Sequence, residues 1–513
     1  MLSKVWSAAT LGIDATRIIV EVDGGSYAAL PGFTLVGLPD AAVREAYSRV
    51  RSALHHCGLW MPPRRITVNL SPADVKKEGS AFDLPIAIGI LHALEFLRDE
   101  DIAGRVFAGE LSLDGSLAPI RGTLSISSAL ADDAEVRELI VPVANAAEAA
   151  AVANVWVIGA PHLTSLIAHL RGDTPLPRAL SSSAVEFDFA EAADFSDVRG
   201  QAQAKRALEV AAAGGHNVML VGPPGSGKTM LAKRLPSILP RLSSEEAITT
   251  TKIHSVAGTL PKGSGLLTKR PFRAPHHTIS TASLVGGGSP PRPGEVSLSH
   301  HGVLFLDELP EFRRDTLEVM RQPMEDGVVT IGRVTRTVTF PARFTLAAAL
   351  NPCPCGYFND HRHECSCSQI QIARYLAKIS GPLLDRIDLQ VEVPALSATE
   401  VSSTESSEPS SDIRERVEAA RDIQRTRFRR TQMQCNAEMA TRSLQRHCEL
   451  DASSRRLLEQ AMTRLGLSAR AYDRVLKVSR TIADLAGSAR LETAHVAEAV
   501  QYRALDRSYF RTG

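Results

Sequence analysis

The spacing of hydrophobic and polar residues changes twice along the chain and predicts three folded parts. Residues 1–175 mix short strand-like runs with helical stretches, which is typical of an α/β domain. In residues 195–394 strands alternate with helices, which favours a mostly parallel sheet. Residues 413–513 show helical spacing throughout. The polar stretches 176–194 and 395–412, the second rich in Ser, Glu and Pro, are predicted to be linkers.

The first part contains enough periodic segments for a complete domain. A hairpin is expected where the Asp-Gly pair in GELSLDGSLAP supplies a tight turn. The expected strands are Arg17–Val22, Arg65–Leu70 and Val155–Ile158, the hairpin is Gly109–Pro119, and the helices are Asp40–Cys57, Phe82–Phe96, Leu124–Ala131 and Ala144–Ala153.

The segment GPPGSGKT matches a phosphate-binding loop at every fixed position. It follows the apolar run Val218–Val221 and leads into a helical segment, which is the strand–loop–helix context that the motif requires. Glycines let the backbone N–H groups approach phosphates, and the helix N-terminus adds partial positive charge. The expected ATP-binding residues are Gly222, Pro223, Pro224, Gly225, Ser226, Gly227, Lys228 and Thr229, with Lys228 on the β/γ-phosphates and Thr229 on Mg²⁺.

Two further apolar runs end in polar residues suited to nucleotide chemistry. Asp307 and Glu308 follow the run that begins at Gly302, and Asn351 follows the run Phe344–Leu350. Ligands of parallel sheets bind at the carboxyl ends of the strands. We therefore expect Asp307 to hold Mg²⁺, Glu308 to polarise the attacking water, and Asn351 to orient that water.

Two arginines are candidates for stabilising charge on the transferring phosphoryl group. Arg386, in GPLLDRIDL, would act as an arginine finger in a neighbouring subunit, or it pairs with Asp385 or Asp388 at the surface. Arg470 begins a helix of the third part and would close over the γ-phosphate, or it is a solvated helical residue.

The order of these motifs resembles the AAA+ ATPase family. FSDVRGQ, which contains Val198 and Gln201, resembles the segment that cradles adenine in that family. The resemblance implies an AAA+ ATPase core with a helical lid, ATP and Mg²⁺ as cofactors, and a ring that is usually hexameric.

Two insertions narrow the resemblance. A long segment, residues 252–299, lies between the phosphate loop and Asp307, and residues 326–344 alternate around a polar tip as a β-hairpin does. Both resemble the pore hairpins of the branch that contains magnesium chelatase motor subunits and the MCM helicases. This implies that Arg333 and Arg336, near the second tip, contact DNA phosphates with little regard to sequence. Alternatively, the hairpin grips protein or nothing.

The whole chain resembles the magnesium-chelatase-like ComM/YifB family. The resemblance rests on RPFRAPHHTIS, GEVSLSHHGVLFLDELPEF, NPCPCG and GPLLDRIDL, in this order after an α/β domain. It implies a hexameric, ATP-driven helicase or translocase that promotes branch migration during natural transformation, working with DNA and other recombination proteins. A protein-remodelling motor of the chelatase type and a scaffold that binds ATP without hydrolysis remain alternatives.

Four cysteines are clustered in the sequence as two C-x-C pairs. Cys353, Cys355, Cys365 and Cys367 can surround one Zn²⁺, although two-residue spacers are commoner, and His361 and His363 offer substitute ligands. The alternative is a loop of four reduced thiols.

Two stretches of the first part resemble the Lon protease domain. VKKEGSAFDLPIAIGIL aligns with the segment of the serine nucleophile and GELSLDGSLAPIRGTLS with that of the lysine, but Ala81 and Leu124 stand at these positions. Ser80 is one residue away, which turns a side chain by about 100° on a helix. Since a Ser–Lys mechanism needs both groups, we expect a Lon-like fold without peptidase activity.

Composition changes this picture little. The 513 residues carry a net charge of +1, so a nucleic-acid contact would depend on local patches. No apolar run is long enough to span a bilayer, and the N-terminal segment lacks the apolar core of a signal peptide. We expect a cytoplasmic protein with no membrane contact.

Overall fold

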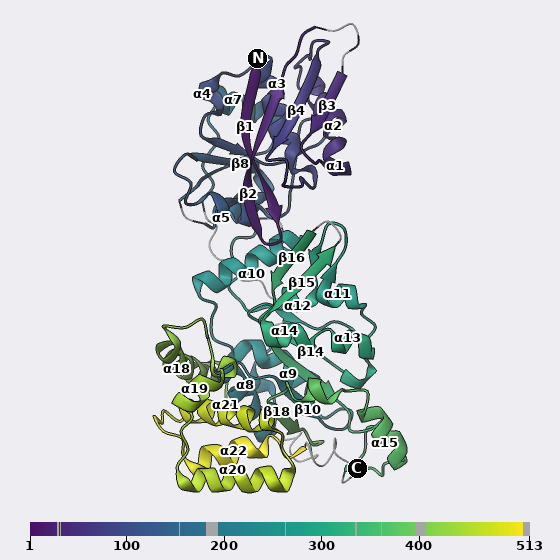
Figure 1. Cartoon of the computed structure of the whole chain (residues 1–513), viewed down its shortest axis with the longest axis vertical. Helices are drawn as coiled ribbons and strands as arrows, with labels where there is room; N and C mark the ends of the chain where they lie inside the picture. The colour runs from purple at the N-terminus through teal and green to yellow at the C-terminus, as the bar shows by residue number, and fades with distance from the viewer. Residues whose placement is uncertain are drawn as a thin grey trace.

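The computed structural model describes residues 1–27, 30, 32–152, 154–180, 193–261, 263–333, 336–360, 362–396 and 407–505. Figure 1 shows an elongated molecule with an α/β domain at one end and a second α/β unit in the middle. The helical part lies beside the second unit.

The N-terminal domain is built on a seven-stranded mixed sheet with the order β3-β4-β2-β1-β5-β8-β9. Its strands are β1 (Leu2–Leu11), β2 (Asp14–Asp23), β3 (Gly32–Val36), β4 (Arg65–Ser71), β5 (Arg105–Phe107), β8 (Glu138–Pro142) and β9 (Trp156–Ala160). Its helices are α1 (Ala41–Arg44), α2 (Ala46–His56), α3 (Asp83–Ala93), α4 (Asp99–Ile102), α5 (Thr123–Leu130), α6 (Ala146–Ala149) and α7 (Leu163–Arg171).

Most expected elements of this domain are present, and the elements that were not predicted include β1, β3, β5, β8 and α7. The predicted helix over residues 40–57 is divided between α1 and α2 at Glu45. Strand β1 was not predicted, because its inward positions include Ser3 and Ser7, both fully buried, which weakens the apolar alternation. The expected hairpin forms from β6 (Glu110–Leu111) and β7 (Leu117–Ala118).

The middle unit has a five-stranded, all-parallel sheet with the order β11-β14-β17-β10-β18. Its strands are β10 (Val218–Val221), β11 (Phe272–Arg273), β14 (Val303–Leu306), β17 (Thr345–Leu350) and β18 (Leu389–Glu392). Strands β10, β14 and β17 consist only of buried residues, as expected of strands covered by helices on both faces.

The remaining elements of the unit surround this sheet. The helices are α8 (Ala202–Gly214), α9 (Lys228–Ile238), α10 (Ser244–Ala257), α11 (Thr281–Val285), α12 (Glu295–Leu298), α13 (Arg314–Glu318), α14 (Arg321–Asp326), α15 (Gln369–Leu376) and α16 (Gly381–Leu384). Two antiparallel pairs are inserted, one of β12 (Gly286–Gly287) with β13 (Arg292–Pro293) and one of β15 (Val328–Arg333) with β16 (Arg336–Pro341). The second pair is the predicted hairpin.

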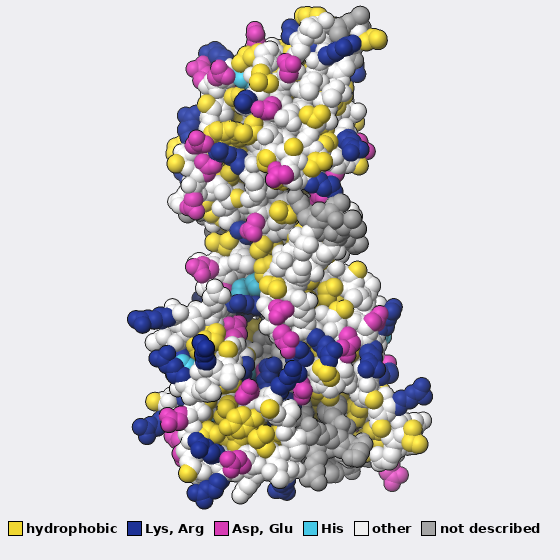
Figure 2. Space-filling view, in the orientation of Figure 1, with side chains coloured by type: hydrophobic (Ala, Val, Ile, Leu, Met, Phe, Trp, Pro, Cys, Tyr) yellow, Lys and Arg dark blue, Asp and Glu magenta, His cyan; other side chains and the backbone are white. Residues whose placement is uncertain are grey.

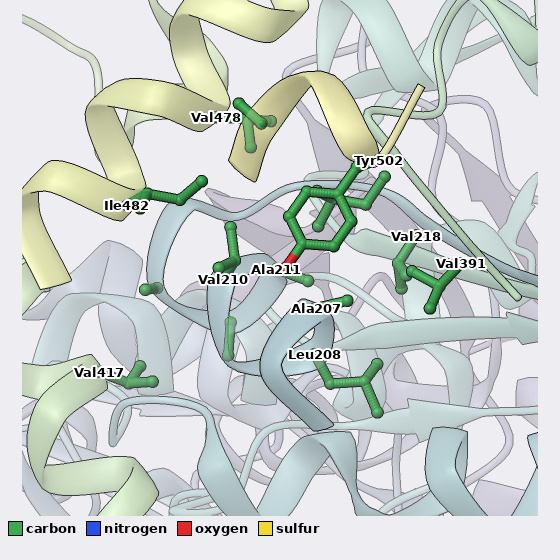
Figure 3. Packing of buried hydrophobic residues seen from close by; sticks show 14 of the residues in the cluster. Ala207, Leu208, Val210, Ala211, Val218, Val391, Val417, Val478, Ile482 and Tyr502 are labelled. Atoms are coloured by element: carbon green, nitrogen blue, oxygen red, sulfur yellow. The ribbon is translucent and has the colours of Figure 1, made fainter. Parts of the chain in front are cut away.

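The C-terminal part is helical, as predicted. It comprises α18 (Ser410–Phe428), α19 (Thr441–His447), α20 (Ala452–Leu465), α21 (Ala469–Leu485) and α22 (Thr493–Gln501). One apolar cluster joins it to the sheet, since Val478 and Ile482 of α21 lie in the same cluster as Val210 of α8 and Val218 of β10 (Figure 3). The helical part and the middle unit therefore share a core. Among the described helices, none is long and apolar enough to cross a membrane.

Candidate nucleotide site and its surroundings

The loop Gly222–Thr229 connects the carboxyl end of β10 to α9, and its turn depends on glycine. Gly225 and Gly227 have φ values of 75° and 91°, in the left-handed region that disfavours other residues. Lys228 begins α9 and is 8% exposed. The loop thus has the geometry that turns backbone N–H groups and a helix N-terminus toward a phosphate.

The side chain of Lys228 is directed into this loop. Its Nζ atom donates hydrogen bonds to the carbonyl oxygens of Gly222 at 2.7 Å and Pro223 at 2.8 Å, and to Oδ1 of Asn351 at 3.2 Å. Burial lowers the pKa of Lys228 from 10.5 to about 8, although Asp307 and Glu308 favour the charged form. The structure therefore brings Asn351 and Lys228 together around a desolvated ammonium group whose described hydrogen-bond acceptors are uncharged oxygens.

The proposed magnesium ligands also meet at this edge of the sheet. Oγ1 of Thr229 donates a hydrogen bond of 2.7 Å to Oδ2 of Asp307. A hydroxyl and a carboxylate that converge beside a phosphate loop suit the oxygen preference of Mg²⁺. Glu308 follows with a φ of 52°, and its carboxylate lies 3.6 Å from Nδ1 of His277.

The expected adenine segment is tied to the phosphate loop. Nε2 of Gln201 donates to the carbonyl oxygen of Pro394 at 2.7 Å and to that of Ser226 at 3.3 Å. Val198 is fully buried, and its carbonyl oxygen accepts hydrogen bonds from Lys205 and Ser407. Gln201 thus fixes the position of its segment relative to the loop that would hold the phosphates.

Arg386 lies at the amino end of β18, away from the phosphate loop at the carboxyl end of β10. It is 9% exposed and forms an ion pair with Glu325 rather than with Asp385 or Asp388. It also donates a hydrogen bond of 2.6 Å to the carbonyl oxygen of Pro382. The structure therefore gives Arg386 a partner within its own chain, in α14.

Arg470 is exposed at the start of α21, which runs along the same amino edge of the sheet. One turn later, Arg474 binds the buried carboxylate of Asp388 at 2.6 Å, and Thr481 contacts His216, which precedes β10. Although burial opposes it, the charge of Arg474 and the hydrogen bond with His216 hold the pKa of Asp388 far below its usual range. Arg470 is thus not brought to its own chain's phosphate loop.

A cavity of about 520 Å³ opens between α14, the hairpin base and the lid at this amino edge. Lys and Arg side chains gather around it on the face shown in Figure 2. Its walls include Arg270, Arg343, Arg421, Arg474 and Lys477, together with the acidic residues Glu246, Glu325, Asp326, Asp388 and Glu438. The lining is therefore mixed in charge.

The hairpin joins the two strands that carry the nucleotide-facing residues. Asp307 follows strand β14, the chain continues through α13 and α14 into β15 and β16, and it returns in β17, which Asn351 follows. Strands β15 and β16 pair in continuous antiparallel register, in which Arg333 lies opposite Arg336. The side chains of both arginines lie outside the described part of the structure.

The four clustered cysteines converge directly after Asn351. The Sγ atom of Cys353 lies 3.3 Å from that of Cys355 and 3.7 Å from that of Cys365, and all four sulfur atoms lie within 4.8 Å of one another. Four sulfur atoms bound tetrahedrally to Zn²⁺ are about 3.8 Å apart, since each Zn–S bond is about 2.3 Å. The donor set therefore fits the metal.

Of the two histidines, the one that the structure describes does not complete this cluster. His363 binds Asp360 at 3.1 Å and packs on Tyr357, and His361 lies outside the described residues. The cysteine loop also contacts the phosphate loop, because a Cβ atom at Gly356 would lie 2.5 Å from Cδ of Pro224.

The Lon-like positions of the N-terminal domain bring no serine–lysine pair together among the described contacts. Ser80 donates its hydroxyl hydrogen bond to Glu110. Leu124 is fully buried in α5, and its backbone N–H binds Glu148 at 2.8 Å. The absence of peptidase activity and the Lon resemblance of this domain stay predictions.

Two residues near the site were missed by the sequence analysis. His277 reaches Glu308 because β11, only two residues long, adds a fifth strand beside β14 and brings the following segment to the same edge. Glu325 meets Arg386 from 61 positions earlier in the chain. The only available signal for His277 was its place in RPFRAPHHTIS, and no local spacing pointed to Glu325.

Comparison with known proteins assigns most of the chain to one family. Residues 194–401 match the family model for magnesium chelatase, subunit ChlI, residues 20–145 match that for subunit ChlI of Mg-chelatase, and residues 407–503 match its C-terminal model. The chain is 45% identical over 510 residues to the competence protein ComM of Haemophilus influenzae, covering 99% of this chain and 98% of that protein. It is 44% identical over 511 residues to YifB of Escherichia coli, with the same coverage.

An ATPase of this family would use ATP and Mg²⁺, which the phosphate loop, Thr229 and Asp307 suit. The chain therefore belongs to the magnesium-chelatase-like AAA+ family that includes ComM and YifB, which confirms the predicted family and fold class.

Proposed function

We propose that this protein is an ATP-hydrolysing motor that moves DNA through a ring of identical subunits. The observation that carries this proposal is the position of the hairpin β15–β16 between the strand ending in Asp307 and the strand ending in Asn351. A change at the nucleotide displaces both ends of the insertion that bears Arg333 and Arg336. Arginines on such a hairpin bind phosphates in a salt-dependent way that is largely independent of sequence.

The relative from Haemophilus influenzae is named a competence protein. We therefore place the motor in natural transformation, where branch migration extends the pairing of an incoming strand. Single-stranded or branched DNA and other recombination proteins are its expected partners, and the cytoplasm is its expected location.

The test compares ATP turnover without DNA, with single-stranded DNA and with a branched junction. The motor requires turnover that rises with DNA, and Arg333→Glu should remove the rise while basal turnover remains. Arg313→Glu is the matched control, because Arg313 is an exposed arginine of the same unit that pairs with the adjacent Asp315. Turnover indifferent to DNA would favour a chelatase-type motor acting on a protein, and no turnover would leave a scaffold.

The ring, expected to be a hexamer, is tested through Arg386. If this residue acts on the nucleotide of a neighbouring subunit, Lys228→Ala and Arg386→Ala should each abolish turnover, and a mixture of the two should regain part of it. Normal turnover by Arg386→Ala would leave the ion pair with Glu325 as the whole role of this residue.

We also propose that Cys353, Cys355, Cys365 and Cys367 bind one structural Zn²⁺. The spacing of the sulfur atoms supports the proposal. Because Gly356 of the cysteine loop packs closely against Pro224, the bound ion would also hold the phosphate loop in place. Metal analysis of protein purified without chelator should find one zinc per chain, and its absence would refute the site.

A further inference from the structure

The tip of the longest strand pair of the N-terminal domain touches the hairpin of the nucleotide-binding unit. Strands β1 and β2 pair from Leu2↔Asp23 to Leu11↔Asp14, so only Gly12 and Ile13 form the turn. Figure 1 shows this tip beside β16 and α10. The contact joins segments more than 300 residues apart in the sequence.

The turn fits closely against one strand of the hairpin. Gly12 has a φ of 63°, and a Cβ atom added there would lie 3.1 Å from Cγ1 of Val338 and 3.6 Å from the carbonyl oxygen of Thr339. Ile13 packs against the apolar cluster that contains four buried hairpin residues, Val329, Ile331, Val338 and Phe340. Ile13, next to Gly12, therefore brings an apolar residue of another domain to the cluster that contains the buried face of the hairpin.

Polar contacts fix the tip on both sides. The carbonyl oxygen of Ile13 accepts a hydrogen bond of 2.6 Å from the buried hydroxyl of Ser125 in α5. Asp14 lies 3.7 Å from Lys252 of α10, although its exposure makes this ion pair weak. The turn is thus held by its own domain and by the helix beside the hairpin.

A buried carboxylate holds the two domains together next to this contact. Glu148 of the N-terminal domain accepts hydrogen bonds from the backbone N–H of Leu124 and from the hydroxyl of Ser255 in α10. A buried carboxylate without hydrogen-bond donors is costly in free energy. Because α10 supplies the Ser255 donor only when it is docked, this hydrogen bond favours one relative position of the two domains. The N-terminal domain is therefore seated on the nucleotide-binding unit, with its tip against the hairpin.

We propose that the N-terminal domain acts as the support of the β15–β16 hairpin, with Ile13 as the residue that couples the two. A two-stranded hairpin is marginal alone and needs another surface on which to pack. Without this support the hairpin would bend under load instead of transmitting the displacement of β14 and β17 to DNA. The structural part of the proposal stands alone, and its role in DNA engagement rests on the proposed function.

The test compares Ile13→Asp with Leu113→Asp in the full chain. Leu113 is an exposed residue in the turn of the β6–β7 hairpin of the same domain, so it receives the same charge outside the β1–β2 turn. Amide hydrogen exchange of residues 336–341 should quicken at least about tenfold in Ile13→Asp and remain unchanged in Leu113→Asp, since an unsupported strand opens locally. ATP turnover without DNA should stay at the wild-type rate in both variants, and its stimulation by DNA should fall only in Ile13→Asp.

The outcomes separate the support from the motor. Unchanged amide hydrogen exchange of residues 336–341 in Ile13→Asp would refute the supporting role of the N-terminal domain, whatever the effect of DNA on ATP turnover. Faster exchange with full DNA stimulation would overturn its role in DNA engagement. Faster exchange in a protein whose wild type shows no DNA stimulation would retain the support and refute the proposed motor.

Discussion

The burial of Lys228 predicts that nucleotide affinity falls as the pH rises above 8. In the nucleotide-free protein the ammonium group is surrounded by the carbonyl oxygens of Gly222 and Pro223, and desolvation lowers its pKa to about 8. Bound phosphates carry negative charge and return the lysine to its protonated state. At high pH, nucleotide binding therefore takes up a proton at Lys228. Because protons are scarce at high pH, this requirement lowers the nucleotide affinity.

The magnitude follows from the protonated fraction of Lys228. For a pKa of about 8, this fraction falls from about 0.9 at pH 7 to about 0.1 at pH 9, so the dissociation constant should rise about tenfold, or about 1.4 kcal/mol. The free energy of unfolding depends on pH in the opposite direction to the nucleotide affinity. Between pH 8 and 10.5 the folded protein binds fewer protons at Lys228 than the unfolded chain does, so this group makes the nucleotide-free fold more stable as the pH rises.

Isothermal titration calorimetry with a non-hydrolysable ATP analogue and Mg²⁺ measures both quantities. At pH 8.5, titrations in two buffers of different ionisation enthalpy should show uptake of about 0.8 proton per nucleotide bound. Lys477→Met is the control, because burial also lowers the pKa of Lys477, which lines the cavity at the amino edge of the sheet. The same affinity at pH 7 and 9, with no proton uptake, would refute the reasoning. It would show that the loop carbonyls alone keep Lys228 charged.

Three further predictions follow from contacts outside the phosphate loop. Glu325→Gln should raise ATP turnover up to about fivefold, because the half-exposed ion pair that holds Arg386 in its own chain is worth about 1 kcal/mol. Glu318→Gln removes another Glu–Arg pair and should leave turnover unchanged. A fall in turnover of Glu325→Gln would mean that the ion pair orients Arg386 for its role. Burial raises the pKa of Glu148, so its contribution to stability declines as the pH rises above the ordinary value of 4.5. Glu148→Gln should therefore raise the unfolding temperature more at pH 7.5 than at pH 5.5, and a lower temperature at both would contradict this. Cys365→Ser should reduce bound zinc, measured by mass spectrometry, from one per chain to nearly none, and undiminished zinc would exclude this cysteine as a ligand.

The sequence was most informative where function depends on neighbouring residues. The phosphate loop is recognisable because its glycines, lysine and threonine occupy eight consecutive positions, and the structure forms the expected strand–loop–helix around Lys228. The β15–β16 hairpin was equally predictable from the sequence, because period-two alternation on both sides of a polar tip is a local signal. Asn351 was expected at the carboxyl edge of the sheet because parallel strands end at a common edge, and its side chain lies 3.2 Å from that of Lys228.

Contacts between distant segments carried no comparable signal. Nothing local indicates that Ile13 packs against an apolar cluster of another domain, since the Gly-Ile turn between β1 and β2 gives no sign of its partner. Strand β1 escaped notice because Ser3 and Ser7 point into the core, where Ser3 binds His92. The partner of Arg386 was misplaced, since the nearby aspartates at 385 and 388 were the obvious candidates and Asp388 is instead committed to Arg474.

In the proposed ring, the charged groups at the two edges of the sheet would belong to sites that two copies of the chain complete. Lys228 and Asp307 follow the carboxyl ends of their strands, whereas Arg386 precedes β18 and Arg470 begins a helix along the amino edge. Four-residue strands such as β10 and β18 separate the two edges by about 13 Å, which is beyond direct contact of either arginine with phosphates held at Lys228. If these arginines stabilise a transferring phosphoryl group, it is therefore one bound to another copy. Glu325, which binds Arg386 from α14, then connects the neighbour's nucleotide to the helix that leads directly into the hairpin. Hydrolysis in one subunit would in this way act on the DNA contact of the next.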